Sequence, residues 1–369
     1  MKRIVLMVML LALLNTETLY AGENEQYDFS DIDRVLREHD EEIDFEDTVI
    51  RVGKGDTGVF GELIDSTLGS LKREIIFGKD NIRQLIVIAI FAGILTLISD
   101  IFNNSSISDT GFGIVYMITA GIVTAGFAAE VDIAENVMKT LMEFMQTLMP
   151  TYLLAVSASG QGMTSSTFYE LTMIIILVIE WMFFKVFIPL VKIYVIISVV
   201  DYMSKERVLS KFSEIIKKMI GWILKTSVYA VAGVNLIEGI VFPSIDAATV
   251  ANVSRVASSI PGMSGVSSLS GIALGSGMLI KNTIGGVGLI SILVICAIPV
   301  VKTGIASFVY QLLAGALQPV TDKRIVGCIS IAGEGIEFLL KAVITCGLLF
   351  MITIAIICLS TNATYYGMG

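Results

Sequence analysis

Histidine is nearly absent from this chain of 369 residues, which holds a single one, His39. A His-dependent intramembrane serine protease needs a histidine in its membrane part, whereas His39 lies in the N-terminal stretch before the apolar runs, and a His-Glu-x-x-His zinc protease needs two histidines as ligands. Neither class fits. A Gly-x-x-x-x-Gly-Lys-Ser/Thr phosphate loop is also missing, because the Gly53-Lys54-Gly55 step lacks the partner glycine and the hydroxyl. We therefore expect neither an enzyme nor a bound cofactor or metal.

Charged residues are scarce as well, at 16% against 54% apolar residues, and the mean hydropathy is +0.81. This composition is typical of a polytopic membrane protein. The charge is concentrated, since residues 22–83 hold 17 Asp and Glu against 8 Lys and Arg, an excess that equals the net charge of −9. None of the four cysteines lies in that stretch, so nothing indicates a disulfide framework.

The N-terminus has the order of a secretory signal. Basic Lys2 and Arg3 precede an apolar run at 4–14 and a polar stretch at 15–18, and Ala21 is a plausible cleavage position. Leu19 is larger than the usual small residue before such a site, so an uncleaved anchor stays open. In either case residues 1–21 form the signal, and we expect 22–83 to be an acidic exported head.

Two stretches of the apolar part echo each other. Residues 149–160 return at 260–271 with one proline, two serines and one glycine in place, and the Ile-Pro-x-Val-Lys step at 188–192 returns at 298–302. Repeated, Pro- and Gly-interrupted membrane segments are typical of transporters and channels. We interpret the echo as a duplication of about 110 residues, repeat A at 115–227 and repeat B at 228–341, against the alternative of convergent membrane composition.

Six apolar runs are near or above the ~20 residues that a spanning helix needs. They lie at about 84–102, 111–129, 171–200, 219–240, 284–318 and 337–359. The third and fifth are unusually long, and each holds the proline of the repeated step, Pro189 or Pro299, so each is either one kinked helix or a tight hairpin. With kinked helices, 84–114 is the first span and its loop, and 342–369 is the last span and a short tail.

The distribution of basic residues favours kinked helices. The strongest basic loop runs from Lys205 to Lys218, and its repeat mate carries Lys323 and Arg324. Both loops lie on the cytoplasmic side if six helices span, as the positive-inside rule requires, although Lys79 and Arg83 count against this topology. The fold class we expect is therefore an all-α polytopic membrane protein with about six spans after the signal.

The segments 131–165 and 244–283 lie outside in this topology, and each joins an amphipathic stretch to a stretch with proline and then serine and glycine. Non-helical backbone at membrane depth survives only when it is buried in protein or faces water. We expect re-entrant segments there that could form a gate. The candidate residues are Pro150, Ser159, Gly160, Pro261, Ser270 and Gly271.

Charges within the apolar runs form a second candidate site, because a charge inside a membrane is costly. Glu180 lies near the middle of the third span, followed by Lys185, and Lys192 and Lys302 follow the two repeated prolines. The charges could form ion pairs within the bundle, or Glu180, Lys192 and Lys302 could line a water-filled path, or the lysines could reach to the interface.

Two motifs in the second half identify a family resemblance: Leu-Ile-Lys-Asn-x-x-Gly at 279–285, and Pro-x-x-Asp-Lys-Arg at 319–324. With the signal and acidic head, they resemble the stage III sporulation protein AE family of endospore-forming bacteria over nearly the whole chain. Gln318, where the family often has an acid, and Gly262-Met263 depart from the pattern. The residues that match it are Lys281, Asn282, Gly285, Gly288, Pro319, Asp322 and Arg324.

The resemblance implies a multi-pass protein of the mother-cell membrane around the forespore, with its head in the intermembrane space. It implies membership of a channel or secretion-like complex with a cytoplasmic ATPase, small membrane subunits, ring-forming proteins and a forespore membrane partner, but no nucleic acid. A free-standing secondary transporter for a small solute and a passive scaffold are the competing classes.

Overall fold

The computed structural model describes residues 27–39, 43–56, 58–77, 90, 94, 105–159, 161–204, 206–258, 264–319 and 321–366. Within these ranges the chain is helical and forms no strand. The proposed signal and most of the first expected span, 84–102, lie outside the described residues.

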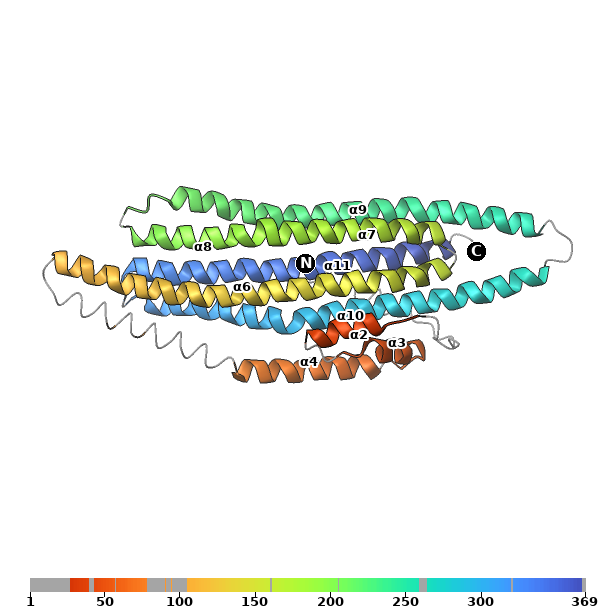
Figure 1. Cartoon of the computed structure of the whole chain (residues 1–369), viewed down its shortest axis with the longest axis horizontal. Helices are drawn as coiled ribbons and strands as arrows, with labels where there is room; N and C mark the ends of the chain where they lie inside the picture. The colour runs from red at the N-terminus through yellow and green to blue at the C-terminus, as the bar shows by residue number, and fades with distance from the viewer. Residues whose placement is uncertain are drawn as a thin grey trace.

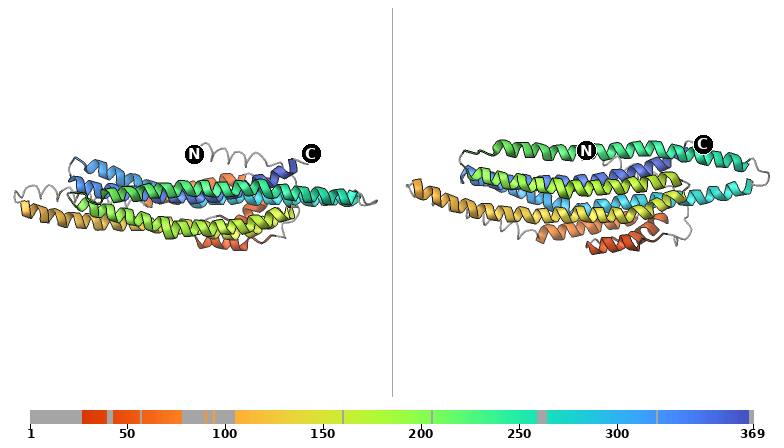
Figure 2. Two further views of the ribbon diagram at one scale, coloured as in Figure 1. Left: turned by 90° about the horizontal axis from the view of Figure 1, so that it is seen from above. Right: turned by 45° about the horizontal axis from the view of Figure 1, so that its top comes forward.

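Long helices running side by side make an elongated bundle (Figures 1 and 2). The first is α6 (Ser105–Ala158). The second rod joins α7 (Gly162–Glu180), a π-helical segment η1 (Trp181–Phe187) and α8 (Ile188–Met203). Then follow α9 (Ser210–Ser258), α10 (Ser264–Leu317) and α11 (Lys323–Tyr366). Consecutive rods run in opposite directions, so the turns after residues 158 and 258 lie at the end opposite the basic turns after 203 and 317.

Among the described residues, five helices are long and apolar enough to span a membrane. They are Phe112–Ala158, Thr164–Met203, Ser210–Ile237, Gly277–Leu317 and Lys323–Asn362. Each covers all or most of one of the five later apolar runs, which confirms an all-α polytopic membrane protein. Four have 40 or more residues, so at 1.5 Å per residue they are ~60 Å long, about twice the thickness of a hydrocarbon core. These rods therefore extend well beyond one bilayer crossing.

Neither long run with a repeated proline folds back on itself, because 171–200 lies in the continuous rod of α7, η1 and α8, and 284–317 lies in α10. Pro299 lies inside α10, and Pro189 lies in the first turn of α8, directly after η1. The hairpin alternative is therefore wrong at both places. The expected non-helical backbone at Pro150 is also wrong, because Pro150 lies inside α6. A proline in a helix removes one backbone hydrogen bond, and packing on both sides maintains the helix here.

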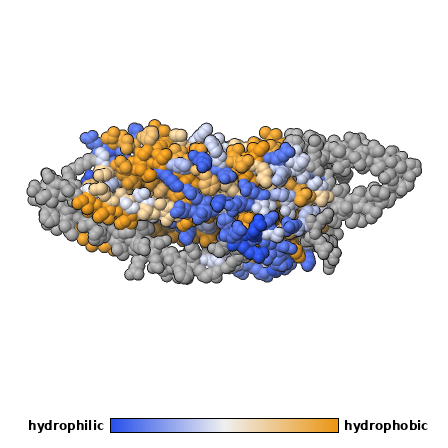
Figure 3. Space-filling view, viewed as in Figure 1, coloured by the Kyte–Doolittle hydropathy of each residue, from blue (hydrophilic) through white to orange (hydrophobic). Residues whose placement is uncertain are grey.

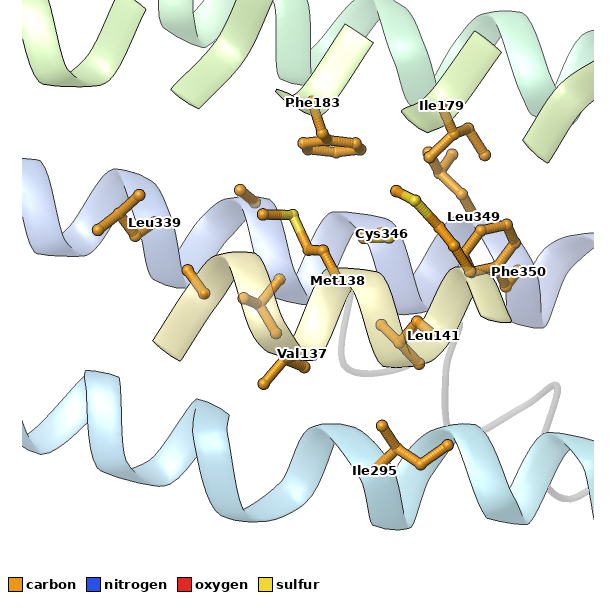
Figure 4. Close-up of a cluster of buried hydrophobic side chains, with 14 of the residues drawn as sticks. Val137, Met138, Leu141, Ile179, Phe183, Ile295, Leu339, Cys346, Leu349 and Phe350 are labelled. Carbon is orange, nitrogen blue, oxygen red and sulfur yellow. The ribbon is translucent and has the colours of Figure 1, made fainter. Parts of the chain in front are cut away.

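The centre of the bundle is a continuous apolar core (Figure 4). It is built from α6, α7, η1, α10 and α11, and its labelled members are Val137, Met138, Leu141, Ile179, Phe183, Ile295, Leu339, Cys346, Leu349 and Phe350. α11 lies in the middle of the bundle, which accounts for its nearly unbroken apolar sequence. Apolar side chains also lie on the outer surface of the bundle, along the upper edge in Figure 3, where α9 lies.

The described residues of the acidic head form the helices α2 (Ser30–Glu38), α3 (Phe45–Gly53) and α4 (Gly58–Phe77). Phe45 packs between Phe29 of the head and Phe144 of α6, with ring centroids 5.7 and 6.1 Å away. The head thus shares its core with the bundle, which provides apolar contacts that so small a segment cannot provide alone. It forms the hydrophilic lower surface in Figure 3.

Charge interactions organise the head. The Arg51 guanidinium donates hydrogen bonds to Asp56 and Glu62, which hold the pKa of both exposed carboxyls below the usual range. The pKa of Asp33 shifts in the opposite direction. Asp33 is buried, and burial raises the pKa of its carboxyl, although its Oδ1 accepts a hydrogen bond of 2.6 Å from the Phe45 amide.

The helix order is compatible with a duplication, because a pair of antiparallel rods occurs twice, α6 with α7–α8 and α9 with α10. Both pairs run in the same direction. The expected repeat boundaries at 115, 228 and 341 fall inside helices, so the repeats are not separate domains.

Candidate functional site

Lys281, from the first family-like motif, is completely buried where α10 meets the ends of α6 and α11. Its Nζ donates a hydrogen bond of 3.0 Å to the backbone carbonyl of Thr361. The same carbonyl accepts a bond of 2.6 Å from Nε2 of Gln161, in the turn between α6 and α7. We call Gln161, Lys281 and Thr361 the lysine clamp, because they join three parts of the chain at one oxygen.

Glycines allow α10 to approach α6 closely beside this clamp. A Cβ on Gly277 would lie 2.9 Å from the backbone of Ala158, and one on Gly285 would lie 3.0 Å from the Tyr152 hydroxyl. A Cβ on Gly288 would meet Leu148 at 2.8 Å. The spacing of Gly285 and Gly288 in the motif is therefore explained by helix packing beside the buried Lys281.

The described part of the chain places no acidic side chain in the clamp to balance Lys281. No ion pair joins Lys281 to a carboxylate of the described residues, and the acceptor atoms Gln161 Oε1 and Asn362 Oδ1 have no hydrogen-bond partner among them. Asn282, the next motif residue, contacts the Cys358 thiol at 3.6 Å. Buried polar groups are normally satisfied, so this end of the bundle is a locally costly arrangement. Its clearest effect is to join the interior of α10 to the turn between α6 and α7 and to the last turns of α11.

Charges also meet between helices nearer the middle of the bundle. Lys192 Nζ lies 2.9 Å from Glu135 Oε1 of α6, and both side chains are partly exposed. Tyr194 donates a hydrogen bond of 2.5 Å to Glu334 of α11, which also pairs with Lys217 of α9. These contacts join α6, α8, α9 and α11.

The charged path is not assembled as the sequence suggested. Glu180 and Lys185 lie on the outer surface of the rod that α7 and η1 form, so the expectation of an ion pair inside the bundle is wrong for them. Lys192 is engaged with Glu135 on a different helix. Lys302 is partly buried on α10 and lies next to Thr303, whose side chain approaches Glu130 of α6.

The second family-like motif forms the turn before α11. Asp322 accepts a hydrogen bond of 2.8 Å from the Arg324 amide and so caps the helix, and the Arg324 side chain folds back onto the same carboxylate. The Arg324 guanidinium also stacks 3.4 Å above the ring centroid of Phe112 in α6. Pro319 is exposed in the turn. This motif therefore joins α11 to α6 at the basic end.

The expected gate residues are only partly described. Ser159 is buried directly after α6, and its hydroxyl donates to the Val156 carbonyl at 2.6 Å. Ser270 and Gly271 belong to the helix α10, so the non-helical backbone expected there is wrong. Gly160 and Pro261 lie outside the described residues.

The head closes one side of a cavity of about 400 Å³ against α6 and α10, lined by Glu38, His39, Asn136, Val137, Thr140, Ile295 and Pro299. At its edge His39 Nε2 lies 2.8 Å from Glu143 Oε2 of α6. The only histidine therefore helps to attach the head. Sequence reasoning missed Glu143 and Glu135, although both belong to the run of charges at 130–143 that interrupts the apolar pattern of α6.

Comparisons with known proteins agree on one family. A family model described as stage III sporulation protein AE matches residues 43–361. Among curated proteins, stage III sporulation protein AE of Bacillus subtilis (strain 168) is 21% identical over 305 residues, which cover 82% of this chain and 76% of that protein. No solved structure matches.

Proposed function

We propose a function from one premise, that this chain belongs to the stage III sporulation protein AE family. It is the membrane-embedded core subunit of a channel or secretion-like complex between mother cell and forespore. In this proposal it resides in the mother-cell membrane around the forespore, with the head in the intermembrane space, and supports late forespore development. Its partners are a cytoplasmic ATPase, small membrane subunits, ring-forming proteins and a forespore membrane protein.

The observation that carries the choice of a subunit is the filled centre of the bundle. A single-chain transporter holds its solute between its helices, near the middle of the membrane. Here the space between the helices at the centre of the bundle is occupied by apolar side chains from α6, α7, η1, α10 and α11 (Figure 4). A passage in which this chain takes part therefore runs between subunits, which favours an assembly over a bundle that acts alone.

A free-standing secondary transporter remains the second candidate, and the lysine clamp favours it. A buried lysine with no carboxylate partner among the described residues, next to acceptors that are unsatisfied there, is the kind of group that transporters place at a solute site. A transporter of this kind acts without other subunits and depends on a coupling ion.

Deleting the gene in the spore former that carries it separates the candidates. A complex subunit predicts arrest of late forespore gene expression, with the same arrest when the gene of the cytoplasmic ATPase is deleted. The proposal fails if spores form normally, or if the chain restores development in cells that lack the other subunits.

A further inference from the structure

The rod formed by α7 and η1 has two different faces at its middle. Ile179 and Phe183 point into the core, where they are fully buried (Figure 4). Glu180 and Lys185, which alternate with them in the sequence, are exposed on the outer face. They lie near the centre of the 40-residue apolar segment Thr164–Met203.

The surface around these charges is apolar and exposed. Leu177 and Trp181 are 60% and 62% exposed, and Ile174 and Val178 are each 54% exposed. A carboxylate and an ammonium on such a face are costly when lipid tails cover it, because lipid tails offer neither a counter-charge nor a hydrogen bond.

Neither charge has a partner among the residues that the structure describes. No ion pair or hydrogen bond joins Glu180 or Lys185 to any of them, whereas Lys192 and Asp201, further along the same rod, are each in an ion pair. The π-helical segment η1 begins directly after Glu180 and contains Lys185. A π-helix bonds residues five apart, so it brings Glu180 and Lys185 towards one face, and such segments are frequent at functional sites.

We propose that this face is the contact between two copies of this chain, in which Glu180 of each copy pairs with Lys185 of the other. The face carries one acid and one base, so it is complementary to itself, as the isologous interface of a twofold dimer must be. Two chains inserted in the same direction place their copies of the rod in parallel. Long helical side chains lean towards the N-terminus, so the Lys185 ammonium reaches back to the level of Glu180 on the neighbouring rod.

The pairing is tested with two differently tagged copies of the full chain, co-expressed and solubilised in mild detergent. Unchanged copies should co-purify. Two copies that both carry E180K, or both K185E, face like charges and should co-purify at least about tenfold less. One copy with E180K and one with K185E restore both opposite-charge contacts, so this mixed pair should recover the level of the unchanged pair.

The exposed pair Lys211 and Glu214 on α9 provides the control, because it is an ion pair within one chain. K211E and E214K should leave co-purification unchanged in every combination. The dimer is refuted if unchanged copies do not co-purify, or if the mixed pair of E180K and K185E binds no better than like pairs, as contact with a different protein would predict.

A cysteine crosslink tests the dimer if the charge variants do not accumulate in cells. Trp181→Cys should form a disulfide between copies under mild oxidation, because it lies beside the proposed axis. Phe308→Cys, 64% exposed on α10, should not. Absence of the crosslink at position 181, or equal crosslinking at both positions, contradicts the proposal.

Discussion

Alanine substitutions at the neighbouring residues Gly285 and Gly286 should change the stability of the protein in opposite directions. A Cβ at position 285 would lie 3.0 Å from the Tyr152 hydroxyl and 3.2 Å from its ring, and Tyr152 is fully buried. A Cβ at 286 meets nothing within 4 Å. Removing a glycine from a helix stabilises by up to about 1 kcal/mol, whereas overpacking a core costs about 1–3 kcal/mol. Gly285→Ala should therefore be less stable than Gly286→Ala by roughly 1–3 kcal/mol.

Thermal unfolding of the purified full chain in detergent measures this order. Gly286→Ala should unfold at or above the temperature of the unchanged chain, and Gly285→Ala below it. Gly288→Ala should lie between them, because its Cβ would meet the flexible end of Leu148 at 2.8 Å. If Gly285→Ala is as stable as Gly286→Ala, the close packing of α10 on α6 is not as described.

Three further changes test other parts of the structure. Lys192→Met should destabilise the chain by roughly 1 kcal/mol or less, since the pair is partly exposed, and adding Glu135→Gln should recover most of the melting temperature; no recovery argues against the ion pair. Burial raises the pKa of Asp33, so the stability that its protonated carboxyl gives the head is present below the unfolded pKa and is lost as pH rises through the raised pKa. Amide hydrogen exchange in α2 of the full chain should therefore become faster over this pH range, and Asp33→Asn should remove the change. Cysteines at Ser30 and Ser210 should respectively react and fail to react with an impermeant thiol reagent from outside, and labelling at Ser210 would overturn the topology.

The helical membrane fold could be predicted from the sequence because hydropathy reports burial in lipid directly. The length of the helices could not, since the charges at 130–143 look like a loop when α6 is considered alone. In the structure the ion pair of Glu135 with Lys192 and the contact of Glu143 with His39 satisfy two of those charges, so the helix continues through them. The helix break expected at Pro150 is wrong for a similar reason, because tertiary packing outweighs the helix-breaking tendency of this proline.

The candidate site could be predicted in part. The family-like motifs directed attention to Lys281 and Arg324, and the structure places both in contacts between helices. Glu180 was expected inside the bundle because its neighbours in the sequence are apolar on every side. Sequence alone does not show which face of such a helix points inward, and packing of Ile179 and Phe183 against α11 turns Glu180 outward.

Purification of the tagged full chain from sporulating cells tests the central claim most directly. The account predicts that the cytoplasmic ATPase and small membrane subunits of the sporulation complex co-purify with it in fixed proportion, and that they are lost together when the chain is removed. Isolation of the chain without these proteins, with ion-coupled uptake of a small solute by vesicles that contain it alone, would contradict the account and establish a free-standing transporter.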